Sequence, residues 1–144
     1  MTMQYPPFQD MPWALWLDDI RNPSVYFDAL GYTMIEEVKD LPVLWARDVE
    51  QAVYFVKSFG TPQFMCLDHD LGVPAYSNTP EKSTKFLGWL ANYVNLVKPI
   101  PYRTHSDNPE GCKSVVAFLE SWYKSSLLPG NEHAYQALKN EEEE

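Results

Sequence analysis

The sequence predicts an α/β fold in which a parallel sheet of about four short strands is flanked by helices. The runs WALWL (residues 13–17) and FMCL (residues 64–67) are apolar without alternation, which is typical of strands buried on both faces. Between them lies an amphipathic helical pattern, so strands and helices alternate along the chain. Strands joined through helices in this way pair in parallel, and their carboxyl ends meet at one edge of the sheet.

The strands are predicted at residues 13–17, 43–46, 64–67 and 100–104. Each is a short apolar or β-branched run that ends at a polar residue or a turn. The fourth strand contains Pro101, which has no N–H to donate to a neighbouring strand. We therefore expect it at the edge of the sheet.

The first helix is predicted between Asp48, as its N-cap, and Gly60, which ends it. A second helix is predicted over residues 86–97, ended by Pro99. A third begins at Asn108 as N-cap, with Pro109 at the first helical position. The inward-facing residues of the three helices are, in order, Val49, Ala52, Val53 and Val56; Phe86, Leu90, Val94 and Val97; and Cys112, Val115, Val116 and Leu119.

The chain length of 144 residues suits one domain, which we place at residues 13–128. Residues 1–12 are then an N-terminal extension. Residues 129–144 form a short C-terminal helix or an acidic tail, because the chain ends in four glutamates.

A net charge of −9 disfavours broad binding to DNA or other nucleic acid, because the protein repels phosphate backbones. No apolar run is long enough to cross a bilayer, so we expect no membrane contact. The two cysteines, Cys66 and Cys112, lie in apolar periodic segments and do not make a disulfide framework. Together these features favour a soluble protein of the reducing cytoplasm.

Ionisable and polar side chains follow directly after three of the predicted strands. They should converge where open α/β sheets bind ligands. The set is Asp18, Asp19, Asp68, His69, Asp70, His105 and Ser106.

The clustered carboxylates predict a divalent metal site, because like charges at close range need a compensating cation. Oxygen ligands without cysteine favour Mg²⁺ or Mn²⁺, with Asp18, Asp19, Asp68 and Asp70 as the metal acids. The structural alternative is that Asp18 is a turn or cap residue and that Asp70 caps the turn at Gly72. His69 and His105 are candidates for the metal or for general acid–base catalysis, and each on its own is equally compatible with a structural role.

Arg21 is placed to grip a phosphate, or to form a salt bridge with Asp19 or Asp68. The helix that starts at Asn108 offers an anion site at its N-terminus. The loop between Leu71 and Lys82 is longer than a connector requires and is a candidate lid. Lys82 and Lys85 are candidates for a phosphate contact, although we expect them to be surface charges.

The runs LWLDDIRNP, CLDHDLG and THSDNPEG together resemble the cyclic-phosphate-processing receiver-like family, whose members contain LDD-x-R, LDHDLG and HS-x-N-x-x-G in that order. The resemblance covers residue 13 to about residue 122. It implies a receiver-like (flavodoxin-like) sheet, an acidic divalent-metal pocket, and a role in processing cyclic phosphates on nucleotides or RNA ends. By position it implies Asp18 and Asp19 as metal acids, Arg21 as the phosphate grip and a central Asp68, His69 and Asp70. His105, Ser106 and Asn108 would form the far wall.

Three functions follow as hypotheses. The first is a metal-dependent phosphoesterase, a hydrolase in which Asp68, His69 and His105 are catalytic and Arg21, Ser106 and Asn108 bind the substrate. The second is a non-catalytic binding or inhibitor protein that occupies a partner protein, as short acidic chains encoded by viruses do. The third is a phospho-receiver with Asp68 as acceptor. It ranks last because a receiver needs a lysine after a fifth strand, and no apolar strand ending in lysine follows Trp122.

Overall fold

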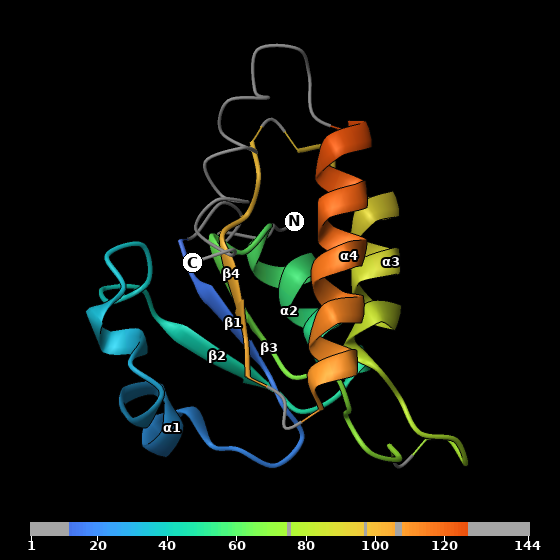
Figure 1. Cartoon of the computed structure of the whole chain (residues 1–144), viewed down its shortest axis with the longest axis horizontal. Coiled ribbons are helices and arrows are strands. Elements are labelled where there is room, and N and C mark those ends of the chain that lie inside the picture. Colours follow the sequence, from blue (N-terminus) through green and yellow to red (C-terminus); the bar gives the residue numbers. More distant parts are fainter. Residues whose placement is uncertain (1–11, 75, 97, 106–107, 127–144) are drawn as a thin grey trace, which may run out of the picture.

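The computed structural model describes residues 12–74, 76–96, 98–105 and 108–126. Its centre is a four-stranded sheet with the strand order β2-β1-β3-β4 (Figure 1). The strands are β1 (Ala14–Leu17), β2 (Val43–Ala46), β3 (Phe64–Leu67) and β4 (Tyr102–Thr104). All neighbouring pairs are parallel, with Leu17 in register with Ala46 and Leu67. This order is that of flavodoxin-like sheets, so the predicted fold class is confirmed.

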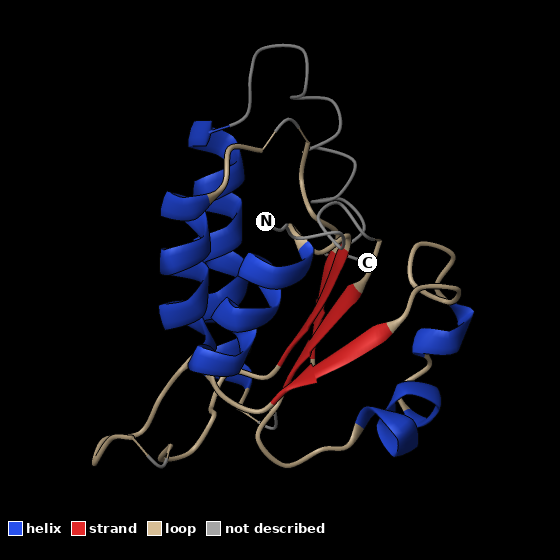
Figure 2. Cartoon of the chain, turned by 180° about the vertical axis from the view of Figure 1, so that it is seen from behind, coloured by secondary structure: helices blue, strands red, loops and turns tan. Residues whose placement is uncertain are grey.

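Two apolar clusters cover the two faces of the sheet. On one face, Leu15, Leu17, Met65 and Leu67 pack against α2 (Val49–Phe59), α3 (Ser83–Tyr93) and α4 (Pro109–Ser126). On the other face, Ala14, Trp16, Phe64 and Cys66 pack against the segment between β1 and β2, which contains α1 (Pro23–Ala29) and η1 (Tyr32–Met34). Figure 2 shows α1 separated from the other helices by the sheet. Covering both faces explains why β1 and β3 have no polar alternation.

Helices α2 and α4 begin where the sequence predicts. The Asp48 side chain accepts a hydrogen bond from the Gln51 N–H at 2.8 Å, and Gly60 follows the helix with a φ of +92°. Asn108 Oδ1 accepts from the Gly111 N–H at 3.1 Å, so Asn108 caps α4. Strand β4 lies at the sheet edge, as predicted, but it begins at Tyr102 rather than at residue 100.

The prediction of a helix over residues 86–97 was wrong at both ends. Helix α3 starts at Ser83, whose N–H donates to His69 O at 2.9 Å, so the chain passes directly from that contact into the helix. It ends at Tyr93, since Val94 is extended with φ −115° and ψ 151°. Asparagine, tyrosine and valine are weak helix formers, which favours this early end. Val94 is partly buried beyond the helix, and Val97 lies outside the described residues.

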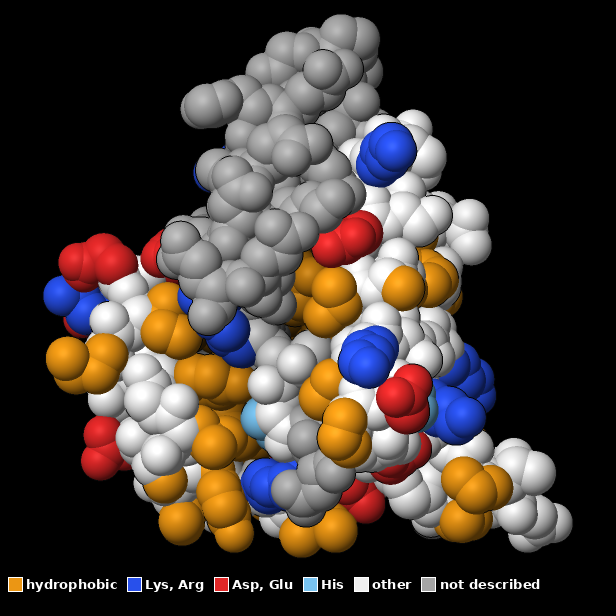
Figure 3. Space-filling view, viewed as in Figure 1, with side chains coloured by type: hydrophobic (Ala, Val, Ile, Leu, Met, Phe, Trp, Pro, Cys, Tyr) orange, Lys and Arg blue, Asp and Glu red, His pale blue; other side chains and the backbone are white. Residues whose placement is uncertain are grey.

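Helix α1 was not predicted, although its start carries the same signals as α4. Asn22 is its N-cap, accepting from the Ser24 N–H at 2.9 Å, and Pro23 is the first helical residue. The helix buries none of its residues, so the apolar stripe that marks longer helices is missing. Val25 and Tyr26 are exposed instead, and Figure 3 shows apolar side chains on the surface in this part of the molecule, at the lower left.

The predicted extensions lie outside the described residues, apart from Pro12. Among the described helices, none is both long and apolar enough to span a membrane. Both cysteines are free thiols, as expected. The carboxyl ends of the strands share one edge, and the candidate site lies there.

Candidate functional site

Asp18 follows β1 directly, and its carboxylate organises the turn after that strand. Oδ1 accepts hydrogen bonds from the backbone N–H groups of Ile20 and Arg21, both at 2.9 Å. Oδ2 lies 2.9 Å from His105 Nε2 and 3.4 Å from Arg21 Nη1. The residue is fully buried. Both oxygens therefore have donors within the protein, as in the structural alternative considered for Asp18.

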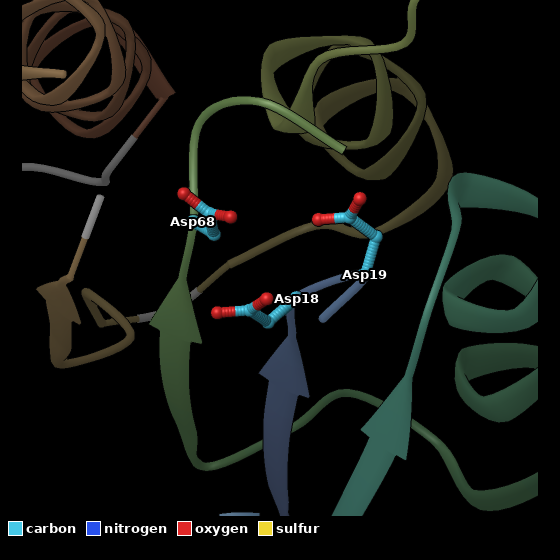
Figure 4. A group of neighbouring side chains, drawn as sticks. All are labelled: Asp18, Asp19 and Asp68. Carbon is cyan, nitrogen blue, oxygen red and sulfur yellow. The ribbon is translucent and has the colours of Figure 1, made fainter. Parts of the chain in front are cut away.

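Asp18, Asp19 and Asp68 form a compact acidic group at the ends of β1 and β3 (Figure 4). One oxygen from each residue lies within 4.8 Å of the others. Asp68 is buried, and its Oδ2 is 3.8 Å from Arg21 Nη1. Asp19 is only partly buried. Of the two salt bridges that the sequence left open for Arg21, the one with Asp68 is present, and a second one joins Arg21 to Asp18.

The pKa values of the two adjacent acids are shifted in opposite directions. Burial acts to raise the pKa of Asp18, but the hydrogen bonds from His105 and from the backbone N–H groups of Arg21 and Ile20 outweigh it, and the pKa falls below its ordinary value. Burial raises the pKa of Asp19, and the neighbouring charge of Asp18 raises it further. Asp19 is therefore the member of the pair whose negative charge is poorly compensated.

His105 is fixed by contacts at both ring nitrogens. A carboxylate only accepts, so Nε2 donates to Asp18, and in the neutral ring Nδ1 accepts from the Tyr32 hydroxyl at 3.4 Å. The imidazole also stacks on Trp16, with ring centroids 4.5 Å apart. Through these contacts His105 holds the Asp18 carboxylate in place, which matches the structural role that the sequence left open for this histidine.

His69 and Asp70 form a second unit beside the acidic group. His69 Nδ1 is 3.0 Å from Asp70 Oδ1, and Asn108 Nδ2 donates to Asp70 Oδ2 at 3.1 Å. Asp70, predicted as a metal acid, is not one of the three grouped carboxylates, and its contact is with the His69 ring. Because Nδ1 donates to Asp70, the neutral ring of His69 carries its lone pair on Nε2.

Helix α4 packs closely on this histidine through Gly111. A Cβ added to Gly111 would lie 2.8 Å from His69 Cβ and would also collide with ring atoms, including Nδ1. The N-terminus of α4 thus contacts His69 directly, and only glycine leaves room for the imidazole there.

Aromatic and basic side chains hold the turn after β1, a role that sequence reasoning missed. Trp16 Nε1 donates to Arg21 O at 2.8 Å, and Trp45 Nε1 donates to Asp18 O at 2.7 Å. Arg47 donates to Asp19 O from Nε at 3.2 Å and from Nη2 at 3.0 Å, while its guanidinium lies over the Trp45 ring. In the sequence, a tryptophan within an apolar run indicates only a packed side chain. The acceptor of its indole N–H becomes visible only in the folded structure.

The loop between Leu71 and Lys82 closes against the same edge. Asp70 and Lys82 form an antiparallel bridge at its base. Gly72 has a φ of +70°, and a Cβ there would lie 2.8 Å from Asp19 Oδ2, so the loop backbone lies against this carboxylate. The loop is therefore part of the wall of the site.

Comparison with known protein families gives a match for this chain. The family model described as the cyclic-phosphate processing Receiver domain matches residues 13–121, which is more than half of the chain. The chain belongs to this family. No curated protein and no solved structure matches the chain significantly.

The cyclic-phosphate processing receiver domain spans all four strands and most of α4. It includes Asp18, Asp19, Arg21, Asp68, His69, Asp70, His105 and Asn108, whose positions are given above. Ser106, predicted to bind substrate, lies outside the described residues. In the described part of the domain, β4 is the last strand, so no strand-end lysine of the phospho-receiver kind is present there.

Proposed function

We propose that this receiver domain is a divalent-metal-dependent phosphoesterase that acts on a cyclic phosphate or a related phosphoester. The observation that carries the proposal is the acidic group, in which three carboxylates offer oxygens within 4.8 Å of one another. Arg21 compensates Asp18 and Asp68 in part, but burial and the charge of Asp18 still raise the pKa of Asp19, so a further cation is favoured at this group. The family description, cyclic-phosphate processing, supports the choice of substrate.

The donor set fits Mg²⁺ or Mn²⁺. The described group contains only carboxylate oxygens, which these ions prefer. Asp19 is partly exposed, and Asp68 faces it, so these two are the proposed direct ligands. Four donors already occupy the oxygens of Asp18, so Asp18 is not proposed as a direct ligand. Its proposed role is to hold the turn that carries Asp19. Such an ion, when bound, would supply Lewis-acid polarisation of a phosphoryl oxygen and would lower the pKa of water at the site.

His69 is the proposed proton carrier and Arg21 the proposed phosphate contact. Hydrolysis joins a water oxygen to phosphorus, breaks one P–O ester bond and returns a proton to the leaving oxygen. His69 takes up the proton at Nε2 and delivers it to that oxygen, while Asp70 holds the ring through Nδ1. Arg21, whose side chain is 20% exposed, turns from Asp68 toward a phosphate oxygen.

Turnover of a panel of 2′,3′-cyclic nucleotides and cyclic-phosphate RNA ends, with and without Mg²⁺ or Mn²⁺, tests this function. We expect metal-dependent hydrolysis. His69→Gln should keep the metal-induced rise in melting temperature and lose on the order of a hundredfold in rate. Asp19→Asn should lose both.

A wild-type protein that binds the metal but hydrolyses no member of the panel would contradict the catalytic role. That result would favour the non-catalytic binding protein. A protein that binds no divalent ion would contradict the metal site itself.

A further inference from the structure

Glu81 is a buried carboxylate that the proposed chemistry does not use. Its side chain is 3% exposed, and it belongs to the loop between Leu71 and Lys82. The other buried acids of the described residues, Asp18 and Asp68, are members of the acidic group. A buried carboxylate is unfavourable unless donors surround it, so its partners indicate what it holds in place.

Three different segments supply the donors to Glu81. Oε1 accepts the backbone N–H of Val49, the first residue of α2, at 2.9 Å. Oε2 accepts the Tyr76 hydroxyl, from the loop, and Lys85 Nζ, from α3, at 3.2 Å. The carboxylate thus ties the loop to the starts of both helices.

The backbone of Glu81 completes the connection to the site. Its N–H donates to Gly72 O at 2.8 Å, and its carbonyl accepts from the Leu71 N–H at 2.9 Å. Gly72 in turn lies against the Asp19 carboxylate, where a Cβ would be 2.8 Å from Oδ2. The Gly72 backbone therefore limits where this carboxylate can lie.

We infer that Glu81, held by the Tyr76 hydroxyl and hydrogen-bonded to the Gly72 backbone, is a positioning residue that fixes Asp19 for cation binding. That Asp19 binds a cation rests on the proposed function, whereas the contacts that hold Asp19 do not depend on it. The loop between Leu71 and Lys82 is then a wall behind Asp19, and Glu81 anchors it.

Tyr76→Phe tests the inference, because it removes the hydroxyl that donates to Glu81. The aromatic ring and the hydrogen bond from Val49 N–H to Glu81 remain. Tyr54→Phe is the matched control, since Tyr54 is an exposed tyrosine on α2. Mn²⁺ affinity is measured on the full chain by electron paramagnetic resonance of the free ion. We expect Tyr76→Phe to weaken affinity about tenfold, the scale for residues that support metal ligands, and Tyr54→Phe to leave it unchanged.

Two further measurements separate positioning from simple stabilisation. In the metal-free protein, the carboxyl ¹³C resonance of Asp19 should shift in Tyr76→Phe and Glu81→Gln but not in the control. Amide exchange of Leu71 and Glu81 should accelerate in the same variants. A lower melting temperature with unchanged affinity and an unmoved Asp19 resonance would overturn the inference.

The metal-free arm also separates this inference from the proposed function. If the wild-type protein binds no Mn²⁺, the proposed metal site fails. The Asp19 resonance then decides by itself whether Glu81 positions that carboxylate.

Discussion

Asp18 and Asp19 are neighbours in sequence with opposite environments. Asp18 is saturated by donors from the turn, Arg21 and His105, and its pKa is lowered. Asp19 has a raised pKa because burial and the charge of Asp18 both disfavour its ionised form. One acid therefore stabilises the fold, and the other holds an unfavourable charge at the edge of the site.

This contrast predicts opposite effects of the same substitution. Asp18→Asn should destabilise the metal-free protein by about 1–3 kcal/mol, because it leaves buried donors without an acceptor. Asp19→Asn should leave it unchanged or more stable, because it removes repulsion. Urea unfolding of both variants, with and without Mg²⁺, measures the difference.

The Mg²⁺ arm adds a second criterion. A hundredfold excess of Mg²⁺ over Kd should raise the free energy of unfolding of the wild type by about 2.7 kcal/mol. In Asp19→Asn this increase should be absent. A destabilised Asp19→Asn in the absence of metal would show that this carboxylate holds the structure and would argue against its role as a ligand.

At the scale of single residues, the sequence predicted which side chains meet but not how they pair. Asp18, Asp68 and His105 converge as expected because each directly follows a parallel strand. The hydrogen bond of Asp70 with His69 was not predictable, because spacing alone does not show which neighbouring side chain a carboxylate contacts. Glu81 was missed because a single glutamate in a polar loop carries no signal of burial.

At the scale of elements, the close packing of α4 on the strand ends distinguishes two glycines. Gly111 leaves no space for a Cβ because His69 occupies it, whereas Gly88 in α3 has no atom within 4 Å of an added Cβ. The two positions differ in surroundings while both lie inside helices.

Gly111→Ala should therefore destabilise the protein by about 1–3 kcal/mol through overpacking, and it should also displace His69. Gly88→Ala should instead stabilise it by about 0.5–1 kcal/mol, the usual gain in a helix interior. Thermal unfolding measures both effects, and the imidazole resonances of His69 report its displacement. Equal effects at the two positions would mean that α4 can move away from the histidine without penalty.

The elements themselves were predictable where local signals and burial agree. The strands β1, β2 and β3 and the helix α2 combine apolar patterns with clear boundaries. Helix α1 has a clear cap but no buried stripe, and α3 has a buried stripe without a side-chain cap at its start. Helix α1 lacks the buried stripe and was not predicted, whereas α3 lacks the side-chain cap and was predicted with wrong ends.

At the scale of the whole molecule, Glu81 links folding stability to pH. Burial acts to raise its pKa, but hydrogen bonds from Tyr76, Val49 and Lys85 outweigh it, and the pKa lies below the ordinary 4.5. Between the folded and unfolded values the unfolded chain binds more protons. The contribution of Glu81 is therefore present above pH 4.5 and is lost as the pH falls through the folded value.

Glu81→Gln should flatten the acid limb of the stability curve. Urea unfolding of wild type and variant between about pH 3 and pH 6 measures the free energy of unfolding along that limb. We expect the two curves to differ most near neutral pH and to approach each other in acid. Parallel curves would contradict a lowered pKa for Glu81 in the folded protein.

The position of β1 between β2 and β3 has a consequence for biosynthesis. Asp18 and His105, which bond to each other, are separated by 87 positions in the chain, and β1 pairs with both β2 and β3. At about 5–20 residues per second, the ribosome makes Asp18 several seconds before its histidine partner. The contact between Asp18 and His105 consequently forms late, because the nascent chain lacks this imidazole donor until β4 has been made.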